Sequence, residues 1–432
     1  MFNIVLRARK DAKAIRYISE KDYAGFLKVT SLGGGRRFSE IEATVDSILE
    51  DPYVPLFLFG RTEKELALEV ERVLAESGRP HYVEVLRTKA VRNMRTDELR
   101  RKLEEIKTRM RLGMEWKEGY VLNPKNPFGL ELDPDYDAYI ALEGFEEIMQ
   151  RLLGIKIGKN SLILRKRMNQ ETYYSGRNLV AEVSKVIGEP TKVEWYCPCI
   201  EDVELNELLR KNETYIRNFE RASISFLKDF EGRPLIPWSG GKDSTAVLLL
   251  AKKAFRDVTA VYVKMEYEMP MTDEYVERVA SLLGVDLVKV SVPMPLWSYG
   301  LPRHTNRWCT AMKVEAIEEV AEKLGANFLV TGDRDPESAR RRVRPPVFGK
   351  KRPEVMPIKY WSGFMVQLYL LLEEIPLHPL YHEGFYRLGC TVCPSLSEWE
   401  IKILKELELP PNTKPHQKCH EKQHDDIAGL SR

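Results

Sequence analysis

The chain has 432 residues, 43% of them hydrophobic, and its 67 Lys and Arg against 65 Asp and Glu leave a formal charge of +2. This length exceeds one ordinary domain, so we expect two or three. The balanced charge excludes a wholly basic nucleic-acid coat and an acidic disordered tail. No apolar run approaches the roughly 18 residues of a membrane helix, and Met1–Lys10 lacks the apolar core of a signal peptide. We therefore expect a cytoplasmic protein with no membrane partner.

The first half of the chain mixes strand and helix patterns. It predicts two strands and two helices before residue 113, at Phe2–Arg7, Val54–Phe59, Glu63–Ser77 and Arg95–Leu112. Asn123–Asp137, rich in Pro, Asn and Asp, is typical of a linker, and Ser161–Val183 alternates like strands around a Ser-Gly turn. We expect an α/β or α+β domain of unknown role over 1–125 and a small middle domain, with a strand pair and a CxC, over 135–200.

From Arg233 onward, short apolar runs alternate with segments of helical period. The predicted strands are Pro234–Trp238, Val258–Met265, Asp286–Val292, Asn327–Thr331 and Val355–Tyr360, and the predicted helices are Thr245–Phe255, Asp273–Leu283 and Lys313–Leu324. Strands that alternate with helices imply a parallel sheet covered on both faces. The sequence therefore predicts a doubly wound α/β domain over 205–432, with a cysteine-rich C-terminal segment.

A glycine-containing loop follows the first predicted strand of this domain: Ser239, Gly240, Gly241, Lys242, Asp243, Ser244 and Thr245. Two glycines let backbone N–H groups approach an anion, and the N-terminus of the following helix adds roughly half a positive charge. Lys242 contributes a cation, the serines contribute hydroxyl donors, and Asp243 suits a Mg²⁺ that accompanies phosphates. The spacing is not that of the Walker loop. The loop therefore predicts a phosphate site of another type, the alternative being an ordinary turn before a helix.

This loop resembles the SGGKDS signature of the PP-loop ATP pyrophosphatases, and later segments resemble the phosphoadenosine phosphosulfate (PAPS) reductase family. Gly332–Ser338 with Arg341 is similar to that family's GxRxxES…R motif. Ile375–Tyr381 is similar to its PxNPLY segment, with His378 where asparagine is usual. The resemblance covers about Arg233–Pro394 and implies the nucleotide-binding fold of that family.

The resemblance also implies site residues. The loop 239–245 would bind the phosphates of an adenine nucleotide, whether ATP, adenylyl sulfate (APS) or PAPS, and Mg²⁺ would accompany ATP. The residues implied to contact substrate are Gly332, Arg334, Glu337, Ser338 and Arg341. Lys313 is implied as a catalytic cation beside the phosphosulfate. Met365 departs from the family, which usually has aspartate there.

The six cysteines are too few for a disulfide scaffold and fall into a CxC, a CxxC and two single positions: Cys197 and Cys199, Cys390 and Cys393, Cys309 and Cys419. Cluster-bearing members of the resembled family have a Cys-Cys pair before a xxxKVE sequence and a CxxC further on. Here Trp308 replaces the first cysteine of that pair and Cys309 matches the second. An iron–sulfur cube normally takes four thiolates, and Cys419 is the candidate fourth ligand unless one iron stays open. A zinc ion on the CxxC, or no metal, are the alternatives.

Cys419 has a second candidate role. Reductases of the family carry a C-terminal Glu-Cys-Gly-x-His nucleophile, and the segment Lys418–His420 matches only its cysteine. Adjacent Lys418 and His420 would favour the thiolate. The CxC has no assigned role: half of a zinc site, a redox pair and two ordinary thiols all remain open.

Two basic stretches suggest a nucleic-acid partner. Arg87–Arg111 holds ten Lys and Arg against four acidic residues, and Arg165–Arg167 is close in sequence to Tyr173 and Tyr174. Basic residues beside exposed aromatics suit single-stranded RNA, including tRNA. The alternative is a solvated helix with ion pairs one turn apart.

The sequence thus predicts a PAPS reductase-like enzyme that reduces APS or PAPS to sulfite, with a thiol electron donor. The alternative is ATP-dependent adenylation of an acceptor such as a tRNA base, followed by sulfur transfer. A flavin adenylyltransferase-like enzyme is less favoured, although Gly332–Pro336 followed by Pro357 and Trp361 is similar to that group. A nucleotide- and cluster-binding sensor is the non-enzymatic option. The oligomeric state is not predicted.

Overall fold

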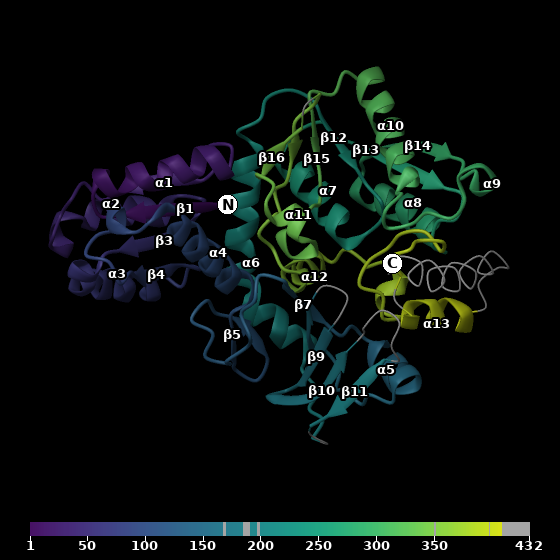
Figure 1. Ribbon diagram of the computed structural model, residues 1–432, viewed down its shortest axis with the longest axis horizontal. Helices are drawn as coiled ribbons and strands as arrows, with labels where there is room; N and C mark the ends of the chain where they lie inside the picture. Colours follow the sequence, from purple (N-terminus) through teal and green to yellow (C-terminus); the bar gives the residue numbers. More distant parts are fainter. Residues whose placement is uncertain (167–169, 185–190, 197–198, 350, 397, 408–432) are drawn as a thin grey trace, which may run out of the picture.

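A long helix, α6 (Leu205–Leu227), lies near the centre of the computed structural model, whose described residues form three larger sheets and one two-stranded hairpin (Figure 1). The structure describes residues 1–166, 170–184, 191–196, 199–349, 351–396 and 398–407. An N-terminal parallel sheet lies on one side of α6, and a C-terminal, mostly parallel sheet lies on the other. Among the described residues, no helix has the length and apolar character needed to cross a membrane.

The N-terminal sheet has the order β2-β1-β3-β4, with every strand parallel to its neighbours. Its elements are β1 (Phe2–Leu6), α1 (Arg9–Asp22), β2 (Lys28–Ser31), α2 (Glu42–Glu50), β3 (Val54–Phe59), α3 (Lys64–Glu76) and β4 (Tyr82–Val85), followed by α4 (Thr96–Leu112). The central strands β1 and β3 are fully buried and almost wholly apolar. A strand covered on both faces must be apolar throughout, which is why the sequence predicted these two strands.

The middle sheet is antiparallel, with the order β11-β10-β9-β8-β7. It follows the hairpin of β5 (Met114–Trp116) and β6 (Tyr120–Leu122) and consists of β7 (Tyr136–Ile140), α5 (Phe145–Leu153), β8 (Leu162–Lys166), β9 (Gln170–Ser175), β10 (Asn178–Ser184) and β11 (Lys192–Trp195). The stretch predicted as a linker is a loop as far as Asp135 and then enters β7, where Asp137 is buried.

The C-terminal sheet has the order β14-β13-β12-β15-β17-β16 and is parallel except between β16 and β17. Its strands are β12 (Pro234–Pro237), β13 (Thr259–Met265), β14 (Asp286–Val292), β15 (Phe328–Val330), β16 (Val347–Phe348) and β17 (Glu354–Val355), and its main helices are α7 (Lys242–Ala254), α8 (Thr272–Leu283), α10 (Trp308–Lys323) and α12 (Gly363–Leu372). The predicted α/β fold with a parallel sheet is confirmed. The helices α7 and α10 begin earlier than expected. In α7 the reason is a polar first turn, Lys242–Ser244, which adds nothing to the apolar period.

The remaining short elements are the helices α9 (Leu296–Tyr299), α11 (Ala339–Arg342) and α13 (Glu398–Glu406) and five 3₁₀ turns: Phe38–Glu40, Arg61–Glu63, Val91–Asn93, Asp335–Glu337 and Pro379–Tyr381. The turn Asp335–Glu337 and α11 follow β15 directly. They place the second sequence motif at the carboxyl edge of the C-terminal sheet, where open α/β sheets bind ligands.

A buried charge cluster fastens the N-terminal sheet to the C-terminal sheet. Lys107 of α4 lies 2.7 Å from Glu104 and 3.5 Å from Asp335, and Asp335 also pairs with Lys359. Lys107 stands 5.1 Å from the ring centroid of Tyr360, a cation–π contact. Lys107, Asp335 and Lys359 are each at most 5% exposed. Because buried charges are tolerated only with partners, this cluster fixes the relative position of the two sheets.

We predict that Asp335→Asn lowers the free energy of unfolding by about 3 kcal/mol, since it leaves two buried ammonium groups without their shared carboxylate. Urea unfolding followed by tryptophan fluorescence measures the change. Glu322→Gln, which breaks the exposed pair with Lys351, is the matched control and should stay within about 0.5 kcal/mol of the parent. Equal effects of the two substitutions would refute a fastening role for the cluster.

Candidate functional site

The loop between β12 and α7 depends on two glycines. Gly240 has φ of 73°, in the left-handed region, and a Cβ there would lie 3.1 Å from the side chain of Val276. Gly332, which follows β15, lies against the first turn of α7: a Cβ at this position would come 3.0 Å from the carbonyl carbon of Asp243 and 3.1 Å from the nitrogen of Ser244. The close approach of these two segments forms one edge of the candidate site.

The hydroxyl groups of the loop divide into two kinds. Ser239 is exposed, and its Oγ lies 3.2 Å from the Oγ of Ser244. Thr245 is buried; its Oγ1 accepts the indole N–H of Trp238 at 3.0 Å and donates to the carbonyl of Gly241 at 2.9 Å. Ser239 and Ser244 therefore remain candidates for phosphate contacts, beside the N–H groups of the first helical turn. Thr245, also predicted to bind the nucleotide, holds the loop in place.

A chain of buried charges runs away from the loop. Lys242 Nζ lies 2.8 Å from Asp243 Oδ2 and donates to the carbonyl of Tyr386 at 2.9 Å. Arg334 Nε lies 2.6 Å from Asp243 Oδ1, and its Nη1 donates to Asp137 of β7 at 2.8 Å. Burial alone would raise the pKa of Asp243, but the charges of Arg334 and Lys242 outweigh it and hold that pKa below its ordinary value. Lys242 and Arg334 are 2% and 1% exposed, so in this structure they neutralise carboxylates of the protein itself and are not accessible to a ligand.

The remaining residues of the second motif surround Arg341. Glu337 accepts the backbone N–H of Arg334 at 2.8 Å and lies 2.6 Å from Arg341 Nη1, while Asp333 lies 3.1 Å from Arg341 Nη2. Ser338 caps α11 by accepting the N–H of Arg341 at 3.1 Å. Burial raises the pKa of Glu337 by more than the two arginines lower it. The side chain of Arg341 is 37% exposed, which makes it the accessible cation of this motif.

Three cysteines share one cavity. Cys309 lies in the first turn of α10, and Cys390 and Cys393 lie in the turn paired with the segment after β13. They line a cavity of about 120 Å³ with Lys313, Arg307 and Arg387. All three thiols are buried. The structure thus places Lys313 with these cysteines, and its Nζ lies 3.5 Å from Glu268. Cys419 and Cys197 lie outside the described residues, and Cys199 is exposed.

The chemistry of this cavity fits an iron–sulfur cluster. A hydrogen bond from Cys390 lowers the pKa of Cys393 to about 4 against the opposing effect of burial, with help from Arg387 and Arg307. Arg387 Nη2 also donates to Cys393 Sγ at 3.4 Å. In the part of the chain that is described, no group of three His, Cys, Asp or Glu side chains that could hold one metal ion is found; Cys419, the candidate fourth ligand, lies outside it. A cluster binds each cysteine through a different iron, and three thiols ringed by cations suit its negative charge.

One segment, Tyr381–Cys393, connects the loop to the cysteine cavity. Tyr381 OH accepts the backbone N–H of Lys242 at 2.9 Å, and the Tyr386 carbonyl accepts from Lys242 Nζ. Arg387, the next residue, reaches Cys393. Tyr386, Arg387 and Arg307 were not predicted as site residues from the sequence. Arg307 and Arg387 could have been predicted, because each lies two or three residues before a cysteine of the cavity. The Tyr386 acceptor could not, because every residue has a backbone carbonyl.

Within the basic stretches considered for RNA, the cations of α4 and of residues 165–166 are largely paired within the protein. Arg165 is buried and lies 3.2 Å from Glu171, and Tyr173 is fully buried, so these two residues do not belong to an exposed surface; Arg167 lies outside the described residues. On α4, Arg100 pairs with Asp22, and Lys102 and Arg109 both pair with Glu105. The alternative of an ion-paired helix therefore describes α4 better.

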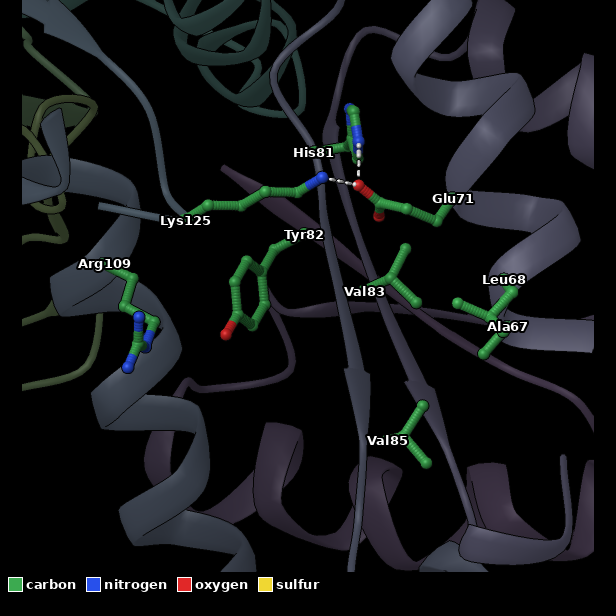
Figure 2. Close-up of a pocket in the computed structure, with 9 residues that line it drawn as sticks. All are labelled: Ala67, Leu68, Glu71, His81, Tyr82, Val83, Val85, Arg109 and Lys125. Carbon is green, nitrogen blue, oxygen red and sulfur yellow. Dashed lines mark ion pairs between the residues drawn. The ribbon is translucent and has the colours of Figure 1, made fainter. Parts of the chain in front are cut away.

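A second cavity, of about 310 Å³, lies beside the edge strand β4 in the N-terminal domain (Figure 2). Figure 2 shows Lys125 and His81 converging on Glu71, while Arg109 stands near the ring of Tyr82. Its other walls are aliphatic side chains of α3 and β4. Lys125 pairs with Glu71, and Arg109 pairs with Glu105 outside the lining. None of the lining residues belongs to the loop, the second motif or the cysteines.

His378 occupies a buried capping position. Its Nδ1 accepts the backbone N–H of Leu380 at 3.2 Å, and its Nε2 lies 3.3 Å from Thr272 Oγ1. Burial, with a smaller effect of Arg278, lowers the pKa of His378 to about 4. The ring is therefore neutral at pH 7. Asparagine, usual here in the resembled family, would supply an oxygen acceptor in the same place.

We predict that His378 makes stability fall as pH decreases from about 7 to about 4. The unfolded chain takes up a proton near pH 6.5, while the folded protein resists it until about 4, so protonation favours unfolding by up to about 3 kcal/mol. His378→Asn should remove this part of the pH dependence, measured as the unfolding free energy at pH 7 and 5. His304→Asn, at an exposed histidine, should retain it. Parallel pH profiles for the parent and His378→Asn would contradict the assignment.

Comparison with known proteins identifies the C-terminal domain. Residues 233–396 match the family described as phosphoadenosine phosphosulfate reductase domain. An uncharacterized protein of Methanocaldococcus jannaschii is 31% identical over 219 residues, which are 47% of this chain and 45% of that protein. The chain thus spans less than half the length of that relative. A PAPS reductase of Alkalilimnicola ehrlichii is 30% identical over 175 residues, 38% of this chain and 71% of that enzyme.

Among solved structures, the U34-tRNA thiolase NcsA of Methanococcus maripaludis, with its 4Fe-4S cluster, aligns over 54% of this chain and 88% of its own at 14% identity and a TM-score of 0.34. The identity to the Alkalilimnicola enzyme over most of its length agrees with the family match and with the parallel sheet that carries the loop. The chain belongs to the PAPS reductase family, within the PP-loop superfamily.

Proposed function

We propose that this protein binds an adenine nucleotide at the loop 239–245 and reduces adenylyl sulfate, as APS or PAPS, to sulfite. The main support for the proposal is that one segment, Tyr381–Cys393, contacts Lys242 at two points and also lines the cysteine cavity. The phosphates of a bound nucleotide and the sulfur atoms of the protein would thereby be close neighbours.

The binding roles follow from which polar groups are accessible. The hydroxyls of Ser239 and Ser244 and the N–H groups at the start of α7 would bind the phosphates. Arg341 would reach the phosphosulfate from the opposite segment. Lys242 and Arg334 would act from behind the loop: they hold Asp243 in its place and contribute positive potential.

The proposed reduction takes two steps. A cysteine thiolate, with Cys419 as the candidate, attacks the sulfur of the sulfate group. The S–O bond to the phosphate breaks, and AMP or its 3′-phosphorylated form leaves with the bonding electron pair. A second thiol, from an electron donor, then attacks the cysteine Sγ and loses its proton to solvent. Sulfite leaves, and the two thiols end as a disulfide that has supplied both electrons.

The cysteine cavity would hold the iron–sulfur cluster. Cys309, Cys390 and Cys393 would be its ligands, and Cys419 is the fourth candidate if it is not the nucleophile. When bound, the cluster would tune the electrostatic potential beside the sulfate. Lys313, Arg307 and Arg387 line the same cavity and would balance the negative charge of the thiolates.

ATP-dependent sulfur transfer is the second candidate function. The position of Arg334 favours it. This arginine pairs with Asp137 and Asp243 and is 1% exposed, so it is not available to neutralise a phosphosulfate, as the reductase would require. In this scheme an acceptor oxygen, on a nucleic-acid base for example, attacks the α-phosphorus of Mg²⁺-ATP and pyrophosphate leaves. A sulfide carried by the protein then attacks the activated carbon of the acceptor, and AMP leaves with the electron pair of the C–O bond.

We predict that Gly332→Ala weakens nucleotide binding about tenfold, or about 1.4 kcal/mol. The added methyl group would press on the backbone of Asp243 and Ser244 and displace the N–H groups at the start of α7. Calorimetry with ATP and with APS measures the loss. Gly389→Ala is the control, because a Cβ there meets nothing within 4 Å. If the Gly332→Ala variant binds both nucleotides with the parent affinity, the loop is not part of the nucleotide-binding site.

We predict that the protein releases sulfite from APS or PAPS in the presence of a dithiol, and that Cys419→Ser lowers the rate at least a hundredfold by removing the nucleophile. Cys199→Ser, at an exposed cysteine, should retain the parent rate. Tight ATP binding without any response to the two sulfonucleotides would refute the reductase and leave sulfur transfer. Sulfite release that survives Cys419→Ser would show that Cys419 is not the nucleophile.

A further inference from the structure

The N-terminal sheet ends in a concentration of positive charge. All four strands are parallel, so their carboxyl ends meet at one edge. Four segments leave or border that edge, residues 7–10, 33–37, 60–62 and 87–92, and they contain no Asp or Glu. Their cations, which we call the basic edge, are Arg7, Arg9, Lys10, Arg36, Arg37, Arg61, Arg87, Lys89 and Arg92.

Most of these cations have no carboxylate partner. Arg7 pairs with the buried Glu63, and Arg92 lies 3.1 Å from the buried Asp11. The other seven are exposed, and across the described ranges none of them forms an ion pair. The nearest exposed carboxylate of the turn, Glu40, accepts the backbone N–H of Arg36 at 2.8 Å. The basic edge therefore presents a surplus of charge to solvent.

The basic edge faces away from the rest of the molecule. Phe2, at the start of β1, packs on Phe219 of α6 and on Tyr360, with ring centroids 6.0 and 5.3 Å apart. The amino ends of the strands therefore lie at the interface with the C-terminal sheet, and the carboxyl ends lie at the outer end of the domain, at the left of Figure 1. The exposed face of α1 continues the charge with Lys13, Arg16 and the half-exposed ring of Tyr17.

We propose that the basic edge binds the phosphate backbone of a single-stranded nucleic acid. Neighbouring strands are about 4.8 Å apart, so the cations are spread over roughly 15 Å and suit several phosphates in a row. Seven of the nine are arginines, which grip phosphates through two N–H groups and stack on bases. The ring of Tyr17 offers a further stacking surface.

Other polyanions fit this surface less well. Among the described residues, the exposed large hydrophobic side chains lie outside the four segments, whereas a membrane-binding surface would carry apolar groups among its cations. The proposal goes beyond the proposed reduction of adenylyl sulfate. It depends on none of the loop or cysteine residues, so the two can fail separately.

The test is the binding of a short labelled single-stranded RNA, and of DNA of the same sequence, measured by fluorescence anisotropy at increasing KCl. Each phosphate neutralised steepens the slope of log K against log salt by about 0.7. Removing four contacts should therefore reduce the slope by about 3 and weaken binding at least tenfold. The basic-edge variant is Arg9→Gln, Arg36→Gln, Arg37→Gln and Arg61→Gln together.

The matched control removes the same net charge from other exposed positions: Lys21→Gln, Arg72→Gln, Lys252→Gln and Arg256→Gln. It should keep the parent affinity and slope, and both variants should keep the parent affinity for ATP. A difference between the RNA and DNA arms would identify the natural ligand. Equal losses in the two variants, no measurable binding by the parent, or displacement of the RNA by phosphatidylserine vesicles in preference to unlabelled RNA would each overturn the proposal.

Discussion

The geometry of the nucleotide loop depends on the chain of buried charges from Lys242 through Asp243 and Arg334 to Asp137. Asp243 and Arg334, in the middle of the chain, each have two partners of opposite charge. Because an unpaired charge in the interior is costly, the four side chains hold one another in a single arrangement. Asp137 belongs to the middle sheet, so the position of the loop depends on a part of the chain that carries no nucleotide motif.

The segment Asp333–Glu337 follows a strand of the C-terminal sheet and contacts both the middle sheet and helix α4. Arg334 joins it to the middle sheet through Asp137, and Asp335 joins it to the N-terminal domain through Lys107. Gly332, which lies against α7, comes directly before this segment and after β15. The motif that the sequence suggested for substrate binding therefore also connects the three parts of the fold. Arg334 is buried because it makes one of these connections.

The elements that could be predicted from the sequence are those that a short stretch of residues determines by itself. The buried strands β1, β3, β12 and β13 are mostly apolar, and the glycine loop is one contiguous segment. The edge strands β2 and β4 were not predicted, because each is half-exposed and mixes polar with apolar residues. Nor could the sequence show that Thr245 would bond to Trp238 or that Asp137, nearly two hundred residues from Arg334, would neutralise it. Such pairings arise from the packing of distant segments.

The segment Tyr381–Cys393 has a thermodynamic consequence. It supplies two partners of Lys242 and two of the three cysteines of the cavity, so a displacement that accompanies a change at the sulfur atoms is transmitted to the loop. Thermodynamic linkage is reciprocal: whatever factor the redox or ligation state of the cysteines imposes on nucleotide affinity, the nucleotide imposes on that state. A nucleotide bound at the loop would then shift the redox or ligation equilibrium of the three cysteines.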